Sequence, residues 1–284
     1  MLAIPVDLQS SGVDMSGRIE QAFHAAGAAD SAAFIAYICA GDPTLESTVE
    51  LAVALAEAGV DIIELGLPFS DPLADGVVNQ AAAQRALEAG ATTAGVFDAV
   101  RAIRRRNGVP LVLYTYLNPV YAFGFADFHA AASQAGLDGL LILDLPPDEL
   151  ARNAELAAGR GLDSIRLVAP TTPESRLPGI VAGGGGFIYY VSQTGVTGER
   201  SEVATSIDSG VAAIRRHTGL PVAVGFGISK PEHVRTVAAA ADGVVVGSAI
   251  VRQIERHGAD PRLPRLVADF VRPLAAAKSR AASV

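Results

Sequence analysis

The sequence has only one cysteine, Cys39, among its 284 residues, so an intramolecular disulfide is excluded and a reducing compartment is indicated. It also contains no apolar run of roughly 18 residues, the length that a membrane-spanning helix requires. The first ten residues lack the basic and apolar regions of a secretory signal. These absences favour a cytoplasmic protein.

Basic side chains suited to catalysis are scarce as well. Lysine occurs only at Lys230 and Lys278, and neither follows a strand-like apolar run, which excludes a Schiff-base aldolase mechanism. Cys39 has no histidine near it in the sequence and is interpreted as a small buried residue. The histidines lie away from predicted strand ends, four in predicted helices and the last in a polar turn: His24, His129, His217, His233 and His257. No metal site is therefore expected.

The charge balance excludes two further classes of partner. Acidic residues outnumber basic ones by 30 to 22, and the longest block of like charge is Arg104-Arg105-Arg106. This pattern does not resemble a nucleic-acid or membrane-binding surface. Half of the residues are apolar and 18% are charged, which is typical of a globular protein with a large core. We expect small molecules or another protein as partners.

Short apolar runs alternate with amphipathic helical stretches along the whole chain. The eight runs predicted as strands are Phe34 to Ile38, Val60 to Leu65, Leu111 to Tyr116, Gly139 to Leu143, Asp163 to Val168, Phe187 to Val191, Val222 to Val224 and Gly243 to Val246. Strands that are apolar on both faces and separated by helices indicate a parallel sheet covered on both sides. Eight such units without a linker predict an α/β fold, a single closed (β/α)₈ TIM barrel over residues 16–284.

Two additions to the regular barrel are predicted. A helix at about Gly17 to Ala26 precedes the first strand and is expected to cover the bottom of the barrel. The second and third strands are unusually far apart, which leaves room for a long loop, Gly66 to Val78, and an extra helix. Loops that follow barrel strands lie at the C-terminal face, where active sites are built. We therefore expect the active site beside this loop.

Glu64 is the first candidate catalytic residue, because it lies inside an apolar run. Carboxylates are almost never buried without a reason. One interpretation is a structural carboxylate paired with an arginine or with backbone amides. The other is a general acid/base whose pKa is raised by apolar surroundings. The position at the C-terminal end of a barrel strand favours the second.

The loop that follows contains two aspartates and two prolines: Pro68-Phe69-Ser70-Asp71-Pro72-Leu73-Ala74-Asp75-Gly76. Asp75 stands next to a glycine that permits close approach, so it could accept a hydrogen bond from a substrate N–H. A plain surface turn made of Asp and Pro is the alternative, and the spacing alone does not decide between them.

Glycine-rich loops follow the last three predicted strands: Thr194-Gly195-Val196-Thr197-Gly198, Gly225-Phe226-Gly227 and Gly247-Ser248. Backbone N–H groups at helix N-termini hold phosphate, and this barrel commonly binds phosphate after its seventh and eighth strands. A single loop of this kind could be only a tight turn, but three predict a phosphate site. Without an imine or a metal, carbon–carbon bond cleavage needs a substrate with its own electron sink. An indole ring protonated at C3 is one.

These motifs, in this order, resemble the tryptophan synthase alpha subunit family, which cleaves indole-3-glycerol phosphate to indole and glyceraldehyde 3-phosphate. The segment 64–76 looks like the signature of that family. The resemblance runs from about Gly17 to the last helix and includes Ala40-Gly41-Asp42-Pro43, Asn118-Pro119, Asp144-Leu145-Pro146, Ser192 with the 194–198 loop, and Gly225 to Ser229. It implies a lyase of tryptophan biosynthesis.

Carried over residue by residue, the resemblance implies that Glu64 removes the proton of the glycerol hydroxyl next to the ring and helps to protonate C3. Asp75 would bind the indole N–H, and Tyr189 is similar to a tyrosine beside the catalytic carboxylate. The substrate-binding residues that it implies are Tyr37 and Phe226 at the ring, Gly198, Gly227, Gly247 and Ser248 at the phosphate, and Thr197 in a lid that closes onto Asp75.

The resemblance also implies a partner, a beta subunit that carries pyridoxal phosphate and receives indole through an internal tunnel, in an α2β2 heterotetramer. Asp71 and the rest of the 68–76 loop would face that subunit. No cofactor is expected in this chain, because neither lysine lies in a pocket position.

The sequence departs from the family after Gly76, where Val77-Val78-Asn79 replaces a proline followed two positions later by an apolar residue. Loss of proline at a helix start removes a preset φ, which weakens the prediction of an ordered 71–79 loop. Residues 1–15 match nothing in the family, and we expect a disordered extension there. Three alternatives stay open: a free-standing indole-3-glycerol-phosphate lyase, a non-catalytic regulatory subunit with the same fold, and another phosphosugar barrel such as an epimerase.

Overall fold

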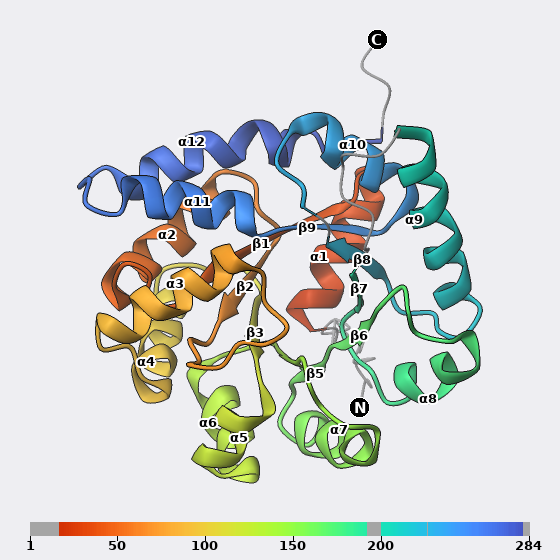
Figure 1. Ribbon diagram of the computed structural model, residues 1–284, viewed down its shortest axis with the longest axis horizontal. Helices are drawn as coiled ribbons and strands as arrows, with labels where there is room; N and C mark the ends of the chain where they lie inside the picture. The colour runs from red at the N-terminus through yellow and green to blue at the C-terminus, as the bar shows by residue number, and fades with distance from the viewer. Residues whose placement is uncertain (1–16, 192–199, 226, 281–284) are drawn as a thin grey trace, which may run out of the picture.

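Parallel strands form one sheet that curls into a nearly closed barrel at the centre of the molecule (Figure 1). The computed structural model describes residues 17–191, 200–225 and 227–280, with the backbone alone for 200–205. The strands are β1 (Ala33–Cys39), β2 (Ile62–Gly66), β3 (Leu111–Thr115), β4 (Gly139–Ile142), β5 (Asp163–Ser164), β6 (Arg166–Val168), β7 (Ile188–Val191), β8 (Val222–Gly225) and β9 (Gly243–Val246). Their order in the sheet, β5-β4-β3-β2-β1-β9-β8-β7-β6, follows the chain around the ring. The predicted TIM barrel is confirmed.

The two edges of this sheet are joined by the chain itself. β5 pairs with β4 and β6 pairs with β7, and only Ile165 separates β5 from β6. The fifth strand predicted from the sequence is therefore two short strands, because the backbone changes its pairing partner at Ile165. The barrel closes through this covalent link.

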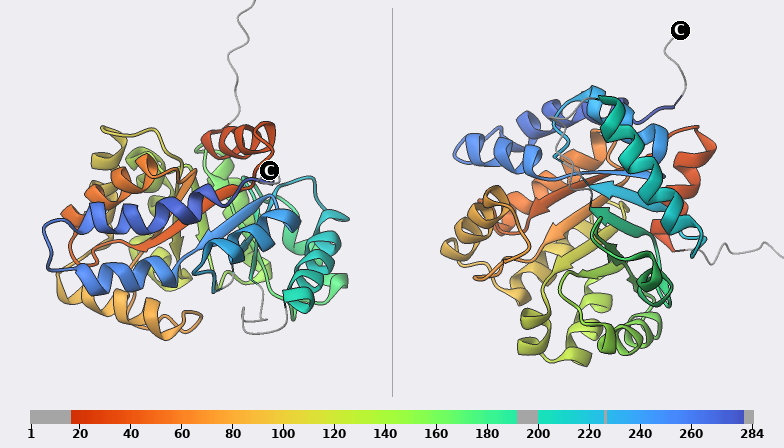
Figure 2. Two further views of the ribbon diagram at one scale, coloured as in Figure 1. Left: turned by 90° about the horizontal axis from the view of Figure 1, so that it is seen from above. Right: turned by 45° about the vertical axis from the view of Figure 1, so that its right-hand side comes forward.

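Helices surround the strands on all sides (Figure 2). They are α1 (Arg18–Ala28), α2 (Leu45–Glu57), α3 (Val77–Glu88), α4 (Thr93–Arg104), α5 (Leu117–Phe123), α6 (Phe125–Ala135), α7 (Leu150–Ala158), α8 (Leu177–Val181), α9 (Arg200–Arg215), α10 (Pro231–Ala240), α11 (Ser248–His257) and α12 (Leu263–Ala276), with short 3-10 turns at Pro147–Glu149 and Glu174–Arg176. α3 is the predicted extra helix between the second and third strands. It begins directly after Gly76, with Val77 as its first residue, so the helix starts here without the proline.

The core has two layers, set by the alternation of side chains along each strand. In β1, Ala33 and Ile35 point into the barrel, whereas Phe34, Ala36 and Ile38 pack outward against the helices. Ile19 and Phe23 of α1 belong to the interior layer. The predicted helix before the first strand thus seals the bottom of the barrel and leaves the C-terminal end for the site.

Two expectations about histidines are wrong in detail. His257 is the last residue of α11 rather than part of a polar turn, and His217 lies in the turn after α9 rather than in a helix. His129 is fully buried in α6, where its ring contacts the Phe125 carbonyl and the Asn153 side chain. His129 is therefore a packing residue of the core.

Two findings concern the limits of the fold. Within residues 17–280, the described helices include none with the length and apolar character that would let it cross a bilayer. The expected disordered extension, residues 1–15, lies outside the described residues.

Candidate functional site

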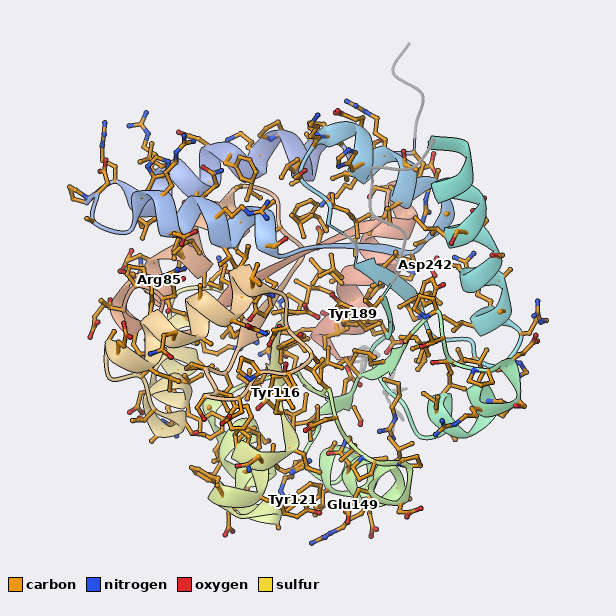
Figure 3. All side chains as sticks on the ribbon, viewed as in Figure 1. Arg85, Tyr116, Tyr121, Glu149, Tyr189 and Asp242 are labelled. Atoms are coloured by element: carbon orange, nitrogen blue, oxygen red, sulfur yellow. The ribbon has the colours of Figure 1, made fainter. Side chains whose placement is uncertain are left out.

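The loops after the strands enclose a cavity of about 540 Å³ at the C-terminal end of the barrel. Most of its walls come from strand ends far apart in the sequence. Among the residues that line it are Tyr37, Asp75, Asn79, Tyr114, Tyr189, Gly227, Gly247 and Ser248. Figure 3 labels two tyrosines of this region, Tyr189 in β7 and Tyr116 directly after β3. The structure therefore brings together the described candidate residues of the ring and phosphate subsites.

Glu64 is fully buried in β2, in register with Tyr37 of β1 and Val112 of β3. Neither carboxyl oxygen has a hydrogen-bond partner among the described residues. Burial raises the pKa of this group from its ordinary 4.5 to about 8. No arginine or backbone amide of the described chain pairs with it, so the structural interpretation finds no support. At neutral pH the group holds its proton and can act as a general acid.

Tyr37 and Tyr189 are interior tyrosines near Glu64. Burial is the main cause that raises the pKa of both hydroxyls, and the charges of Glu64 and Asp75 raise it further. Glycines make room for the rings: a methyl group on Gly66 would overlap the Tyr37 hydroxyl, and one on Gly225 would overlap the Tyr189 hydroxyl. The glycine at each strand end thus sets the position of the tyrosine on the neighbouring strand.

Asp75 is held by two tyrosines that sequence reasoning missed. The Tyr114 hydroxyl donates to Oδ1 at 3.0 Å, and the Tyr116 hydroxyl donates to Oδ2 at 2.9 Å. The Tyr116 oxygen in turn accepts a hydrogen bond from the Ala74 N–H at 3.0 Å. Burial raises the pKa of Asp75, and the bonds from Tyr116, Tyr114 and Asn79 lower it. The plain surface turn is thus wrong for this aspartate, which lines the cavity.

The expected phosphate end differs in one respect from the sequence prediction. Gly247 immediately precedes α11, whose first residue is Ser248, so N–H groups of a helix N-terminus face this region. Gly227, with φ of +46°, lies in the loop after β8, but α10 begins only at Pro231, which has no N–H. Of these two glycine loops, only the one that contains Gly247 leads directly into a helix.

Three expected site residues, Thr197, Gly198 and Phe226, lie outside the described residues. Asp71 is described and exposed, and it accepts a hydrogen bond from Ser70 at 2.6 Å. It does not line the cavity. This position agrees with a role outside the ligand pocket.

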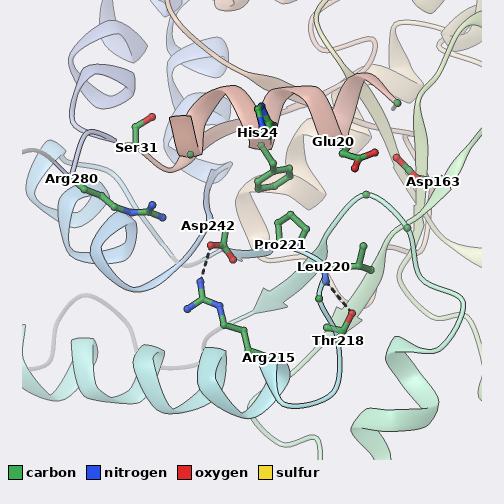
Figure 4. A pocket seen from close by; sticks show the side chains of 16 residues that line it. Glu20, His24, Ser31, Asp163, Arg215, Thr218, Leu220, Pro221, Asp242 and Arg280 are labelled. Carbon is green, nitrogen blue, oxygen red and sulfur yellow. Dashed lines mark hydrogen bonds and ion pairs between the residues drawn. The ribbon is translucent and has the colours of Figure 1, made fainter. Parts of the chain in front are cut away.

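A larger cavity, about 820 Å³, lies at the opposite end of the barrel, between α1 and the segments that precede β7, β8 and β9 (Figure 4). Arg215 and Asp242 form an ion pair of 2.8 Å within it. Burial raises the pKa of Asp163 there to about 6. Conserved chemistry in TIM barrels sits at the other end, so this cavity is not the candidate active site. In the described part of the chain, no cluster of three or more side chains could hold a metal ion.

The fold and the site define a (β/α)₈-barrel enzyme whose ionisable groups, two carboxyl groups and several tyrosines, converge at the C-terminal end of the strands. The family model for the tryptophan synthase alpha chain matches residues 23–272. The chain belongs to the tryptophan synthase alpha chain family.

Individual relatives agree with this assignment. The chain is 53% identical over 264 residues to a tryptophan synthase alpha chain of Opitutus terrae, which covers 93% of this chain and 99% of the relative. It is 52% identical over 242 residues to the alpha chain of Geobacter sulfurreducens, covering 85% and 91%. Among solved structures, the alpha chain of Legionella pneumophila superposes with a TM-score of 0.86 at 34% identity, covering 95% and 100%. A Mycobacterium tuberculosis tryptophan synthase structure gives 0.83 at 36%, covering 93% and 99%.

Family membership settles the general activity. The chain is a carbon–carbon lyase that cleaves indole-3-glycerol phosphate to indole and glyceraldehyde 3-phosphate, for tryptophan biosynthesis. It pairs with a beta subunit, and the pyridoxal phosphate belongs to that subunit, not to the alpha chain.

Proposed function

We propose that Glu64, Asp75 and Tyr189 carry the cleavage reaction in this chain. Glu64 acts as the general acid/base, Asp75 accepts the hydrogen bond of the indole N–H, and Tyr189 stands beside the catalytic carboxyl group. The observation that carries this proposal is the Glu64 carboxyl group, fully buried, without a partner among the described residues and with a pKa of about 8. Such a pKa suits proton transfer near neutral pH.

The electron flow follows from the substrate. A proton delivered to C3 turns the indole ring into an iminium. The hydroxyl next to the ring then loses its proton and becomes the aldehyde carbonyl, while the carbon–carbon bond breaks and its electron pair returns to the ring. Protonated Glu64 supplies the first proton and, once ionised, takes the second. Asp75 stabilises the positive charge on the ring nitrogen, and the hydroxyls of Tyr114 and Tyr116 hold the Asp75 carboxylate in place.

The remaining contacts divide the cavity into two ends. Tyr37 and Phe226 line the ring subsite, and Gly198, Gly227, Gly247 and Ser248 bind the phosphate. Support for the phosphate end comes from the α11 N-terminus, which has no side-chain cap among the described residues and whose helix dipole favours an anion. From the family resemblance alone, we infer that Thr197 acts in a lid that excludes water from the iminium stage.

The 68–76 loop faces the beta subunit in an α2β2 heterotetramer. Leu73 is 92% exposed and Val77 is 79% exposed, beside the exposed Asp71. An exposed leucine in the loop that leads to Asp75 supports a docking role for this loop. We also assign residues 16–284 to one catalytic domain, because the described strands belong to one sheet. We place the enzyme in the cytoplasm on the basis of its single, free and buried cysteine.

The test is indole formation from indole-3-glycerol phosphate, with and without a beta subunit, by the wild type and Glu64→Gln. We expect Glu64→Gln to lower kcat by about 10²- to 10⁴-fold, the usual contribution of a general acid/base. Glu57→Gln, an exposed carboxylate at the end of α2, is the matched control and should keep full activity. A loss of only a few-fold in Glu64→Gln would refute the mechanism. Full activity without a beta subunit would favour the free-standing lyase.

A further inference from the structure

Arg252 brings a positive charge to the cavity at the C-terminal end of the barrel. Among the described residues that line this cavity, Asp75 is the only acidic one and Arg252 the only basic one. Arg252 is exposed, and it has no hydrogen-bond or ion-pair partner among the described residues. Arginine keeps its charge at neutral pH and presents five N–H donors. The cavity therefore has a cation that the proposed mechanism does not use.

Arg252 belongs to the helix whose N-terminus faces the cavity. α11 begins at Ser248, directly after Gly247, and both of these residues line the same cavity as Arg252. Arg252 follows Ser248 by four positions, so the two side chains lie on the same face of α11. Helical side chains lean toward the N-terminus of their helix, which directs Arg252 over the first turn of α11. That turn is where free N–H groups and the helix dipole attract an anion.

The charge of the substrate calls for such a cation. Indole-3-glycerol phosphate carries a phosphate monoester, whose charge at neutral pH is about −1.5 to −2. In the proposed function, on which this step rests, the phosphate binds at the α11 N-terminus, which supplies only about half of an elementary charge. The Asp75 carboxylate adds negative charge to the same cavity. A guanidinium supplies a full positive charge and matches the spacing of two phosphate oxygens.

The neighbours of Arg252 along the helix leave it available for a ligand. Glu255, the one acidic residue of α11, pairs with Arg85 of α3 at 3.2 Å. The next basic residue, Arg256, is exposed like Arg252 but does not line the cavity. The two arginines of this helix thus differ in their access to the cavity, which makes Arg256 a matched control.

We propose that Arg252 is a further substrate-binding residue: its guanidinium donates hydrogen bonds to the phosphate of indole-3-glycerol phosphate at the N-terminus of α11. This contact balances the phosphate charge that the helix dipole leaves uncompensated. It lies away from the carbon–carbon bond that breaks, so it is made equally before and during the reaction. Arg252 therefore sets the affinity for phosphorylated ligands and has little effect on the bond-breaking step.

The experiment uses the complex with a beta subunit and measures two quantities. One is the Kd of glycerol 3-phosphate, which carries the phosphate without the indole ring, and the other is the split between KM and kcat for indole-3-glycerol phosphate. In Arg252→Gln we expect this Kd and the KM to rise about tenfold or more, as for other lost charge-assisted hydrogen bonds, and kcat to change less than about twofold. Arg252→Lys keeps the charge and should bind glycerol 3-phosphate more tightly than Arg252→Gln. Arg256→Gln should leave all three values unchanged.

A ligand without phosphate separates this role from a general effect on the cavity. Indole-3-glycerol, the dephosphorylated substrate, should inhibit the wild type and Arg252→Gln with the same inhibition constant. An unchanged Kd for glycerol 3-phosphate in Arg252→Gln overturns the proposal, and so does an equal loss of affinity for both ligands. If glycerol 3-phosphate does not compete with the substrate in the wild type, the phosphate end of the proposed function is itself wrong.

Discussion

At the scale of single residues, the proposed chemistry depends on how differently the carboxyl groups of Glu64 and Asp75 are solvated. Glu64 has no hydrogen-bond partner among the described residues, so burial alone raises its pKa to about 8. Asp75 is also partly desolvated, but two tyrosine hydroxyls donate to it and counteract the rise. One group is therefore suited to hold a proton and the other to hold a charge, which is the division of labour that the proposed mechanism needs.

The raised pKa of Glu64 predicts a pH-dependent stability. Between the ordinary pKa of 4.5 and about 8, the folded protein keeps a proton that the unfolded chain releases. Stability therefore falls as pH rises through this window. Glu64→Gln removes the titration, so its melting temperature relative to the wild type should increase between pH 5 and pH 8. Asp163, whose pKa is raised to about 6, is present in both proteins, so its titration cancels in the difference between their melting temperatures. A difference in Tm that does not change with pH would contradict the assigned pKa.

Sequence alone predicts some of these residues and misses others for a physical reason. Glu64 is visible because a carboxylate inside an apolar run is exceptional. Tyr114 and Tyr116 are not visible, because their hydroxyls reach an aspartate 39 and 41 positions away. The only local signal is the alternation in β3, which points Tyr114 inward with Val112.

At the scale of elements, the strand ends and the glycines that follow them position the site. The predicted strands agree with the structure to within one or two residues in most cases, because runs that are apolar on both faces identify buried parallel strands well. The division of the fifth strand was not predictable, since β5 and β6 differ in pairing partner rather than in composition. Whether α10 or α11 supplies a helix N-terminus to the cavity also depends on where the backbone turns after each strand.

Gly66 offers a test at this scale. An added Cβ would lie 2.7 Å from Cζ of Tyr37, closer than real contacts allow. In Gly66→Ala the Tyr37 ring must move within the cavity wall, and overpacking of this kind costs about 1–3 kcal/mol. We expect a lower Tm and a fall in kcat/KM of about tenfold, measured with indole-3-glycerol phosphate. Gly27→Ala in α1, where a Cβ would meet nothing within 4 Å, should keep both values near those of the wild type. Equal behaviour of the two variants would mean that Gly66 has no role in placing Tyr37.

At the scale of the whole molecule, the two ends of the barrel have different tasks. α1 packs Ile19 and Phe23 into the interior layer and closes the bottom. The opposite end carries the cavity, which Val77 helps to line, and the exposed apolar side chain of Leu73 lies outside it. An alpha chain that hands indole to its partner needs its site and its docking surface at one end. The loop that contains Asp75 also contains Leu73, so the proposed contact with the beta subunit and the proposed substrate contact belong to one segment.

Leu73 therefore provides the test of this arrangement. Its side chain is 92% exposed and does not line the cavity, so Leu73→Asp should change the activity of the isolated chain by less than about twofold. Burying a new charge in an apolar interface weakens association, and we expect the Kd for the beta subunit to rise about tenfold or more, measured by titration of indole release or by calorimetry. Ser209→Asp, which adds the same charge to an exposed position of α9, should leave the Kd unchanged. If Leu73→Asp bound the beta subunit as tightly as the wild type, the 68–76 loop would not be the docking surface.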